Sequence, residues 1–282
     1  MTVRNVPVAE TRFLLRDHGS GDGTPVVLLH GVPETSSCWR AIAPALATGR
    51  RVLAPDLPGL GGSAYSGPFD VPSVVGQLMA LVQQEIGRQR FDLVGHDWGG
   101  SLALAIAGAF PGQVRSLVVA NAPYRKVPAL RAAHIPFFGL PVAPELVFRL
   151  GGKRIVDLMF AIGWKADGRL DPEVLAEYTA AYTDPGKVSA MLGYYRAVAR
   201  PRAKALLMRR PVEHPPRVQA DRMTVLWGAA DPVLPVWVGE SVQKDLGSDC
   251  TMVTVPKAGH FVIEEAPEVS LETIAEAVAE QG

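Results

Sequence analysis

The chain has 282 residues, 48% of them hydrophobic, and its 28 basic residues balance 28 acidic ones to a formal net charge of zero. A chain of this size can bury one large core together with a smaller inserted unit. The zero charge excludes a global field that would attract nucleic acid or an anionic membrane, so we expect a small, neutral partner.

Six short runs rich in β-branched residues are predicted to form strands. In chain order they are PVVLLHG (25–31), RVLAPDLPG (51–59), FDLVGHDWGG (91–100), VRSLVVANAP (114–123), MTVLWGAAD (223–231) and CTMVTVPKAGH (250–260). Near-continuous apolar runs are typical of strands covered on both faces, as in parallel sheets. Helical patterns lie between them at 71–89 and 101–110, and a third closes the chain at 270–281. The sequence therefore predicts an α/β fold with a mostly parallel sheet flanked by helices.

The strand rhythm stops between Arg125 and about Pro215, where helical patterns with aromatic and basic residues replace it. We predict a core made of residues 1–124 and 216–282 and an inserted helical cap made of residues 125–215. Such a cap would lie above the site and exclude bulk water. Its basic segment RPRAKALLMRR is predicted to form a solvated face.

Four of the predicted strands end in residues that can do chemistry. His30 to Pro33 close the first run, Asp97 the third, Asp231 the fifth and His260 the sixth. Ligands of open parallel sheets bind outside the carboxyl ends of the strands. These four loops should therefore form one site.

The segment GHDWGG at residues 95–100 predicts a nucleophile elbow, a tight turn from a strand into a helix. Its third position, often Ser or Cys, is Asp97 here, and Gly95, Gly99 and Gly100 allow strand and helix to approach closely. The amides at the start of the helix would keep Asp97 ionised. An ordinary helix N-cap is the alternative interpretation. An ionised aspartate can attack an electrophilic sp³ carbon directly and form an alkyl ester.

His260, within KAGHF, is predicted to activate the water that hydrolyses this ester, and Asp231 to orient the histidine. The chain order Asp97, Asp231, His260 matches nucleophile, acid and histidine. Because Asp231 precedes Pro232, a turn or helix cap is the alternative for it. The usual rival position for the acid, at the end of the preceding core strand, holds the uncharged Asn121. For His260 the alternative is a surface histidine.

The turn HGVPETSSCWR is predicted to complete the site. The backbone N–H of Val32, together with that of Trp98, would bind the oxyanion formed during hydrolysis of the ester. The alternative is a plain Gly-Pro turn in which His30 is satisfied locally.

These motifs resemble the α/β-hydrolase fold in its aspartate-nucleophile branch, which comprises epoxide hydrolases, haloalkane dehalogenases and fluoroacetate dehalogenases. The resemblance covers essentially the whole chain, with HGVPE, GHDWGG, WGAADPVLP and AGHF in family order. Fluoroacetate dehalogenases carry arginines where this chain has Trp98 and Ser101, which argues against a haloacid substrate. Many haloalkane dehalogenases carry an asparagine where this chain has Val32. Trp98, and Trp164 in the cap, would remain as halide donors.

Among these groups the chain most resembles the epoxide hydrolases. It shares HGVPE followed by WR, and GYYRA looks like their lid segment, which implies that Tyr195 donates a proton to the epoxide oxygen. A tyrosine that only packs the cap is the alternative. A second lid tyrosine is usual in the family, but Phe148 stands nearest to its expected place. The second donor stays open among Tyr194, Tyr178, Tyr182, His134 and Trp164.

The resemblance implies hydrolysis of an epoxide to a vicinal diol through an ester on Asp97. Haloalkane dehalogenation by the same triad is the alternative, and a noncatalytic binding member of the fold is a third. The substrate pocket should be hydrophobic. Its predicted lining is His30, Pro33, Phe148, Trp164 and Tyr194. The expected partners are a small hydrophobic epoxide or halide and water, and the expected state is a monomer or homodimer.

Neither a membrane segment nor a metal site is predicted. The longest apolar stretches fall short of the roughly 20 residues that span a bilayer, and the first residues show no apolar signal region. Cys38 and Cys250 lack CxxC spacing, and the six histidines are scattered. We therefore expect a cytoplasmic protein without metal or cofactor.

Overall fold

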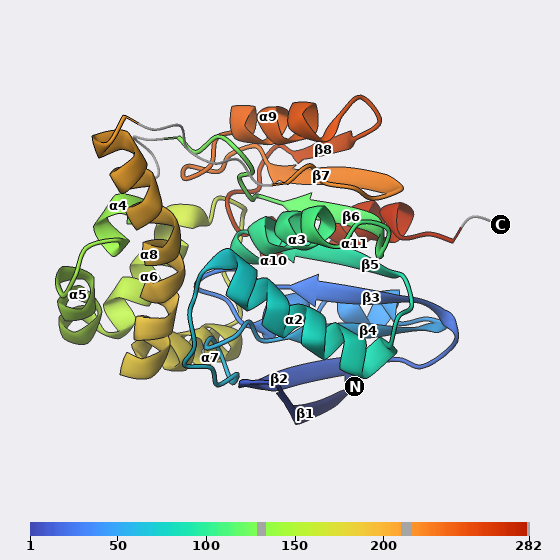
Figure 1. The fold of residues 1–282 in the computed structure, drawn as a ribbon, viewed down its shortest axis with the longest axis horizontal. Coiled ribbons are helices and arrows are strands. Elements are labelled where there is room, and N and C mark those ends of the chain that lie inside the picture. The colour runs from blue at the N-terminus through green and yellow to red at the C-terminus, as the bar shows by residue number, and fades with distance from the viewer. Residues whose placement is uncertain (129–133, 210–215, 281–282) are drawn as a thin grey trace.

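A computed structural model describes residues 1–128, 134–209 and 216–280 of the chain. An eight-stranded sheet forms its centre, in the order β1-β2-β4-β3-β5-β6-β7-β8 (Figure 1). Strands β3 to β8 pair in parallel, whereas β1 and β2 pair antiparallel at one edge. The strands are Thr2–Val8 (β1), Thr11–His18 (β2), Gly23–Leu29 (β3), Arg50–Pro55 (β4), Phe91–His96 (β5), Val114–Ala120 (β6), Arg222–Gly228 (β7) and Thr251–Val255 (β8).

All six predicted runs form strands, and the α/β-hydrolase architecture is confirmed. The central strand β5 is buried along its whole length, as its continuous apolar run indicates. The hairpin β1–β2 was not predicted. Its strands are partly exposed, and β2 carries polar residues between its buried ones, so the hairpin lacks the continuous apolar runs that revealed the others.

Helices cover both faces of the sheet. In Figure 1 α2 and α3 lie in front of it and α11 lies behind. The helices outside the insertion are Ser36–Trp39 (η1, a 3₁₀ helix), Ala43–Leu46 (α1), Val71–Ile86 (α2), Trp98–Ala109 (α3), Val236–Leu246 (α9), Val262–Glu265 (α10) and Pro267–Ala277 (α11). Helix α2 begins where the Asp70 carboxylate accepts a hydrogen bond from Ser73 N, and it ends at Gly87, whose φ is +66°.

The described residues between β6 and β7 contain five helices, which form what we call the helical insertion (Figure 1). They are His134–Phe138 (α4), Ala143–Gly151 (α5), Lys153–Gly163 (α6), Pro172–Thr183 (α7) and Pro185–Leu207 (α8). The insertion lies beside the ends at which the parallel strands terminate. The predicted cap boundary at 215 falls outside the described residues, so the division at 125 and 215 stays a prediction. Within the described ranges, no helix is long and apolar enough to cross a membrane.

Candidate active site

Asp97 occupies a strained turn between β5 and α3. Its φ is +48°, a left-handed conformation that is costly for a residue with a side chain. The turn is held by a hydrogen bond of 3.1 Å from Asp97 N to Ala120 O. A Cβ on Gly99 would collide with the carbonyl oxygen of Leu29, so only glycine allows α3 to approach β3 this closely. The backbone thus has the geometry of the predicted nucleophile elbow, and Asp97 is not an ordinary cap, since its side chain makes no capping hydrogen bond.

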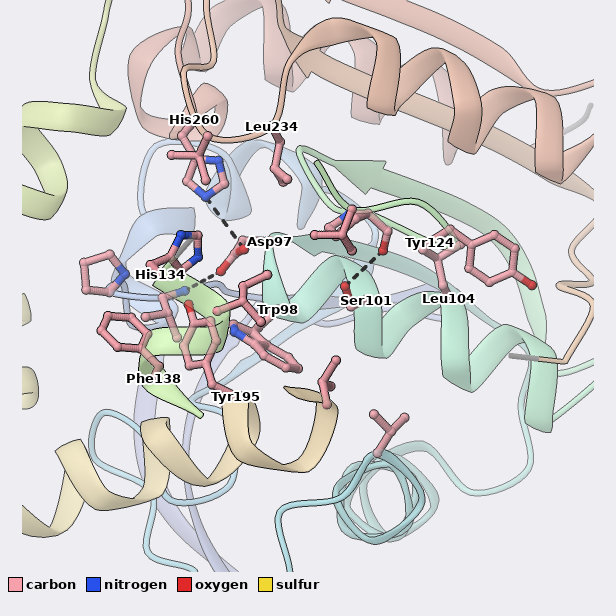
Figure 2. A pocket seen from close by; sticks show the side chains of 18 of the residues that line it. Asp97, Trp98, Ser101, Leu104, Tyr124, His134, Phe138, Tyr195, Leu234 and His260 are labelled. Atoms are coloured by element: carbon pink, nitrogen blue, oxygen red, sulfur yellow. Dashed lines mark hydrogen bonds and ion pairs between the residues drawn. The ribbon is translucent and has the colours of Figure 1, made fainter. Parts of the chain in front are cut away.

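The structure brings Asp97, Asp231 and His260 together although they are far apart in the sequence. His260 Nδ1 lies 2.8 Å from Asp231 Oδ2, and His260 Nε2 lies 3.7 Å from Asp97 Oδ1 (Figure 2). The Asp231 side chain is fully buried, while that of Asp97 keeps 16% of its surface exposed. The histidine therefore bridges a buried carboxylate and a carboxylate that faces a cavity.

The electrostatics of these three groups are mutually dependent. Burial alone would raise the pKa of Asp97, but the adjacent His260 lowers it below its ordinary value. The pKa of Asp231 is also lowered, because His260 and hydrogen bonds outweigh burial. Burial alone would lower the pKa of His260, but the two carboxylates raise it well above its ordinary value. The resting site thus favours an ionised Asp97 beside a histidine that readily holds a proton.

Asp231 is fixed from several sides. Its Oδ1 accepts hydrogen bonds from the backbone N–H groups of Val233 (2.7 Å) and Leu234 (2.9 Å). Its Oδ2 accepts one from the Asn121 amide at 2.7 Å, in addition to that from His260. Asp231 therefore makes the contacts of both predicted interpretations: its carboxylate caps the turn after Pro232, and it also contacts His260. Asn121, which occupies the rival position for the acid but carries no charge, donates a hydrogen bond to Asp231.

One of the two predicted oxyanion donors contacts the Asp97 carboxylate. Val32 N donates a hydrogen bond of 3.0 Å to Asp97 Oδ2, and Trp98 is the first residue of α3. An ester formed by Asp97 Oδ1 would leave Oδ2 as its carbonyl oxygen, already in contact with one backbone donor.

A mostly apolar cavity of about 520 Å³ opens in front of Asp97 and His260. Helix α3 supplies one wall, and the helical insertion supplies Tyr195 and His134, which lie opposite Asp97 in Figure 2. The rings of Tyr195 and His134 meet edge to face with centroids 5.8 Å apart. Tyr195 also packs edge to face on Trp98, at 5.2 Å.

Of the five residues predicted to line the pocket, only Pro33 does so. His30 lies beneath the site, where Nε2 accepts a hydrogen bond from Leu57 N. Trp164 turns away and donates Nε1–H to Ala166 O at 3.2 Å. Phe148 is buried against Phe138 instead of facing the cavity.

Tyr194 does not line the cavity either, because it precedes Tyr195 by one position on α8 and its side chain points about 100° away from that of Tyr195. Its hydroxyl donates to Pro58 O at 2.8 Å. Two other candidates for the second donor are also occupied, since Tyr182 donates to Glu34 O and Tyr178 to Glu264. Of the five candidates left open by the sequence, only His134 lines the cavity.

Sequence reasoning missed a buried polar layer behind His260. His96 Nδ1 lies 2.7 Å from Glu34 Oε2, and His96 Nε2 lies 2.8 Å from the carbonyl oxygen of His260. All these side chains are buried. The glutamate of HGVPE and the histidine of GHDWGG stand in the motifs themselves, but their pairing depends on tertiary contact. In the described part of the chain, no group of three His, Cys, Asp or Glu side chains is arranged to hold a metal ion.

Comparison with known proteins places this geometry in a family. A model of the "Alpha/beta hydrolase family" matches residues 26–273. The chain belongs to this alpha/beta hydrolase family.

Its relatives within the alpha/beta hydrolases include epoxide hydrolases. It is 29% identical over 282 residues to a soluble epoxide hydrolase from Corynebacterium sp. (strain C12), with 90% of each chain covered. It is 27% identical over 281 residues to the AB hydrolase superfamily protein YfhM of Bacillus subtilis (strain 168), with 93% of each covered. The crystal structure of the Cif epoxide hydrolase from Acinetobacter nosocomialis shares the fold, with a TM-score of 0.82 and 20% identity over 98% of this chain and 88% of that one. The resemblance to epoxide hydrolases is thereby confirmed.

Proposed function

We propose that this alpha/beta hydrolase opens a small hydrophobic epoxide and releases a vicinal diol. The observation that carries the proposal is the placement of the Asp97 carboxylate on a strained turn, facing an apolar cavity with Tyr195 on its opposite side. A serine in this position would need a base before it could attack, whereas an ionised aspartate needs none. Similarity to the Corynebacterium soluble epoxide hydrolase supports the same chemistry.

In the first step, Asp97 Oδ1 attacks a ring carbon of the epoxide and its C–O bond breaks. The Tyr195 hydroxyl donates its proton to the departing oxygen, so that no bare alkoxide is expelled. Burial raises the pKa of Tyr195, which keeps this hydroxyl protonated until the ring opens. The product of the step is an alkyl ester on Asp97.

His134 is the best-placed second donor. Its ring lies at the cavity beside that of Tyr195. Burial lowers the pKa of His134, which favours the neutral imidazole with one N–H to donate. Tyr195 and His134 would then each donate a hydrogen bond to the epoxide oxygen.

In the second step, His260 removes a proton from a water molecule that attacks the ester carbonyl carbon of Asp97. Ester formation removes one of the two negative charges that raise the pKa of His260, so the histidine loses its proton more easily and the neutral imidazole, the form that can accept a proton from water, is favoured. The backbone N–H of Val32 and that of Trp98 stabilise the oxyanion. The intermediate then collapses: the bond between the acyl carbon and the alcohol oxygen breaks, and this oxygen leaves with the proton held by His260, which releases the diol. Asp97 is regenerated as the acid and returns one proton to the Tyr195 phenolate, which restores the ionised carboxylate and the phenol. Asp231 keeps the imidazole oriented throughout.

Haloalkane dehalogenation is the second candidate, since the same carboxylate can displace a halide. Trp98 lines the cavity, but the indole N–H of Trp164 is bound to Ala166 O and does not face it. A departing halide would therefore meet fewer donors than an epoxide oxygen. A noncatalytic binding protein is disfavoured by the intact contacts of Asp97, Asp231 and His260.

The test is to trap the ester. His260→Gln should still be alkylated but should not turn over, so incubation with styrene oxide should raise the intact mass by the whole mass of the epoxide. The double variant Asp97→Asn, His260→Gln is the control and should gain nothing. A gain from 1-bromobutane equal to its mass less hydrogen bromide, with none from the epoxide, would place dehalogenation first. The absence of an adduct from both would contradict the covalent mechanism.

A further inference from the structure

One basic side chain of the insertion faces the cavity. Arg202 lines it together with Tyr195 and Val198, which occupy the same side of α8 at positions i, i+3 and i+7. Arg202 follows Tyr195 by almost two helical turns, which corresponds to about 10 Å along the helix axis. Position 202 of the helix therefore lies at a distance from Tyr195, at which the proposed reaction takes place.

The cavity continues in that direction with apolar walls. Along α3, Ser101 and Leu104 lead away from Asp97 towards Tyr124 (Figure 2). Val198 provides an apolar surface from α8 between Tyr195 and Arg202. A ligand that reaches both ends must have an apolar middle.

Arg202 differs from its basic neighbours. Arg200 and Lys204 are exposed, whereas Arg202 is partly buried. The sequence predicted a solvated face for the whole segment, and for Arg202 this is wrong. Among the described residues no hydrogen bond or ion pair engages the Arg202 side chain, and burial lowers the pKa of Arg202 because its charge loses hydration. A partly desolvated cation of this kind gains most from an anionic ligand.

The net charge of the whole insertion also favours an anionic ligand. Residues 125–215 contain 15 Lys and Arg against 8 Asp and Glu, although the chain as a whole is neutral. The insertion, which supplies Tyr195, Val198 and Arg202 to the cavity, thus carries a net positive charge that would attract anions. The expectation of a neutral partner rests on the total charge, which hides this difference between the insertion and the rest of the chain.

We propose that the cavity takes an epoxide whose apolar chain ends in a carboxylate, and that Arg202 binds this carboxylate while the epoxide lies at Asp97. The proposal names the substrate class of the site and rests on the proposed function. Arginine suits the role because its planar guanidinium can donate two parallel hydrogen bonds to a carboxylate. The rise of about 10 Å from Tyr195 to Arg202 along α8 calls for a long apolar chain, such as that of decanoate.

A binding experiment tests the role of Arg202 without any turnover. At pH 8, decanoate and decanamide are titrated calorimetrically into the wild type, Arg202→Met and the matched control Lys204→Met. The wild type and Lys204→Met should bind decanoate roughly tenfold to a hundredfold more tightly than decanamide, as expected for hydrogen bonds to a charged group. Arg202→Met should bind both alike, and Arg202→Lys should recover part of the preference. Equal affinity of the wild type for both ligands, or an equal loss in Lys204→Met, would overturn the proposal.

Turnover then separates this proposal from the proposed function. With decanoate carrying a terminal epoxide, Arg202→Met should raise KM by a similar factor with little change in kcat. With the primary amide of that epoxide, the variant should match the wild type. If the wild type opens neither epoxide but decanoate binding still depends on Arg202, epoxide hydrolysis fails and the carboxylate site stands. If both epoxides are opened with no dependence on Arg202, the carboxylate site fails and epoxide hydrolysis stands.

Discussion

At the scale of single residues, the buried carboxylates near the site differ in how they are satisfied. Asp231 accepts hydrogen bonds from backbone N–H groups, an amide and His260. Glu264 is also buried, but it contacts Tyr178 (2.5 Å) and Arg40 (2.7 Å) and feels the negative charge of Glu34. Burial and Glu34 raise the pKa of Glu264 to about 7, against the lowering effect of Tyr178 and Arg40. Its ionisation therefore depends on pH near neutrality.

Glu264 should make the folded state less stable as pH rises. The folded state keeps its proton up to about pH 7, while the unfolded chain releases it near pH 4.5, so the free energy of unfolding falls between these values. Glu264→Gln should remove this fall, of the order of 3 kcal/mol. Urea unfolding of the wild type, Glu264→Gln and the exposed control Glu268→Gln, at several pH values, measures it. Identical pH slopes in all three proteins would contradict the raised pKa.

At the scale of elements, the close contact of α3 with the sheet produces the strained turn. Gly99 lies against the backbone of Leu29 and His30, and Gly95 lies against Gly99, so there is no room for a Cβ at either position. Because α3 cannot move away without breaking its packing on β5 and β6, the chain must turn sharply at Asp97. The strained conformation of Asp97 is thus a consequence of how α3 packs on the sheet.

Two glycines in helices should respond in opposite ways to alanine. Gly99→Ala forces α3 off the strand backbone and should destabilise the protein by about 3 kcal/mol or more. Gly76→Ala, at an exposed position of α2 with open space around it, should stabilise by about 0.5–1 kcal/mol. Denaturant unfolding compares the two variants. A neutral Gly99→Ala would show that the contact between α3 and β3 is looser than the structure indicates.

At the scale of the whole molecule, α7 ties the helical insertion to the loop that carries Val32. The carboxylate of Glu177 accepts hydrogen bonds from Thr35 (2.6 Å) and Ser37 (2.7 Å) and pairs with Arg16 at 2.9 Å. Five residues further along α7, Tyr182 donates to Glu34 O at 2.9 Å. Helix α7 of the insertion and the loop that carries Val32 are therefore parts of one connected structure.

Weakening this connection should loosen α7 without unfolding the protein. Glu177→Gln replaces an ionised acceptor by an amide, so hydrogen–deuterium exchange in Pro172–Thr183 should accelerate several-fold while exchange in β5 stays unchanged. Glu173→Gln, at an exposed position one turn earlier, is the control and should leave this exchange close to that of the wild type. If both variants exchange alike, Glu177 does not hold the insertion in place.

Much of the core and the site could be predicted because short stretches determine their own conformation. The apolar runs marked six of the eight strands, and GHDWGG marked the turn at Asp97 because its glycines allow only one way of joining strand to helix. The order of Asp97, Asp231 and His260 sufficed to predict that they meet, because the carboxyl ends of parallel strands share one edge. The hairpin β1–β2 could not be predicted in this way, since it lacks such runs.

Only the tertiary structure decided which side chains reach the cavity. Tyr194 and Tyr195 are adjacent on α8, yet one binds Pro58 O and the other faces Asp97, because successive helical residues point about 100° apart. The same rotation separates Arg202 from its exposed neighbours. The sequence by itself determined the six parallel strands and the turn at Asp97, which depend on local geometry, and the chain order of Asp97, Asp231 and His260, which meet because parallel strands end at one edge of the sheet. The hydrogen-bond partners of these three residues and the far end of the cavity depend on how distant segments pack together, and no local pattern encodes that.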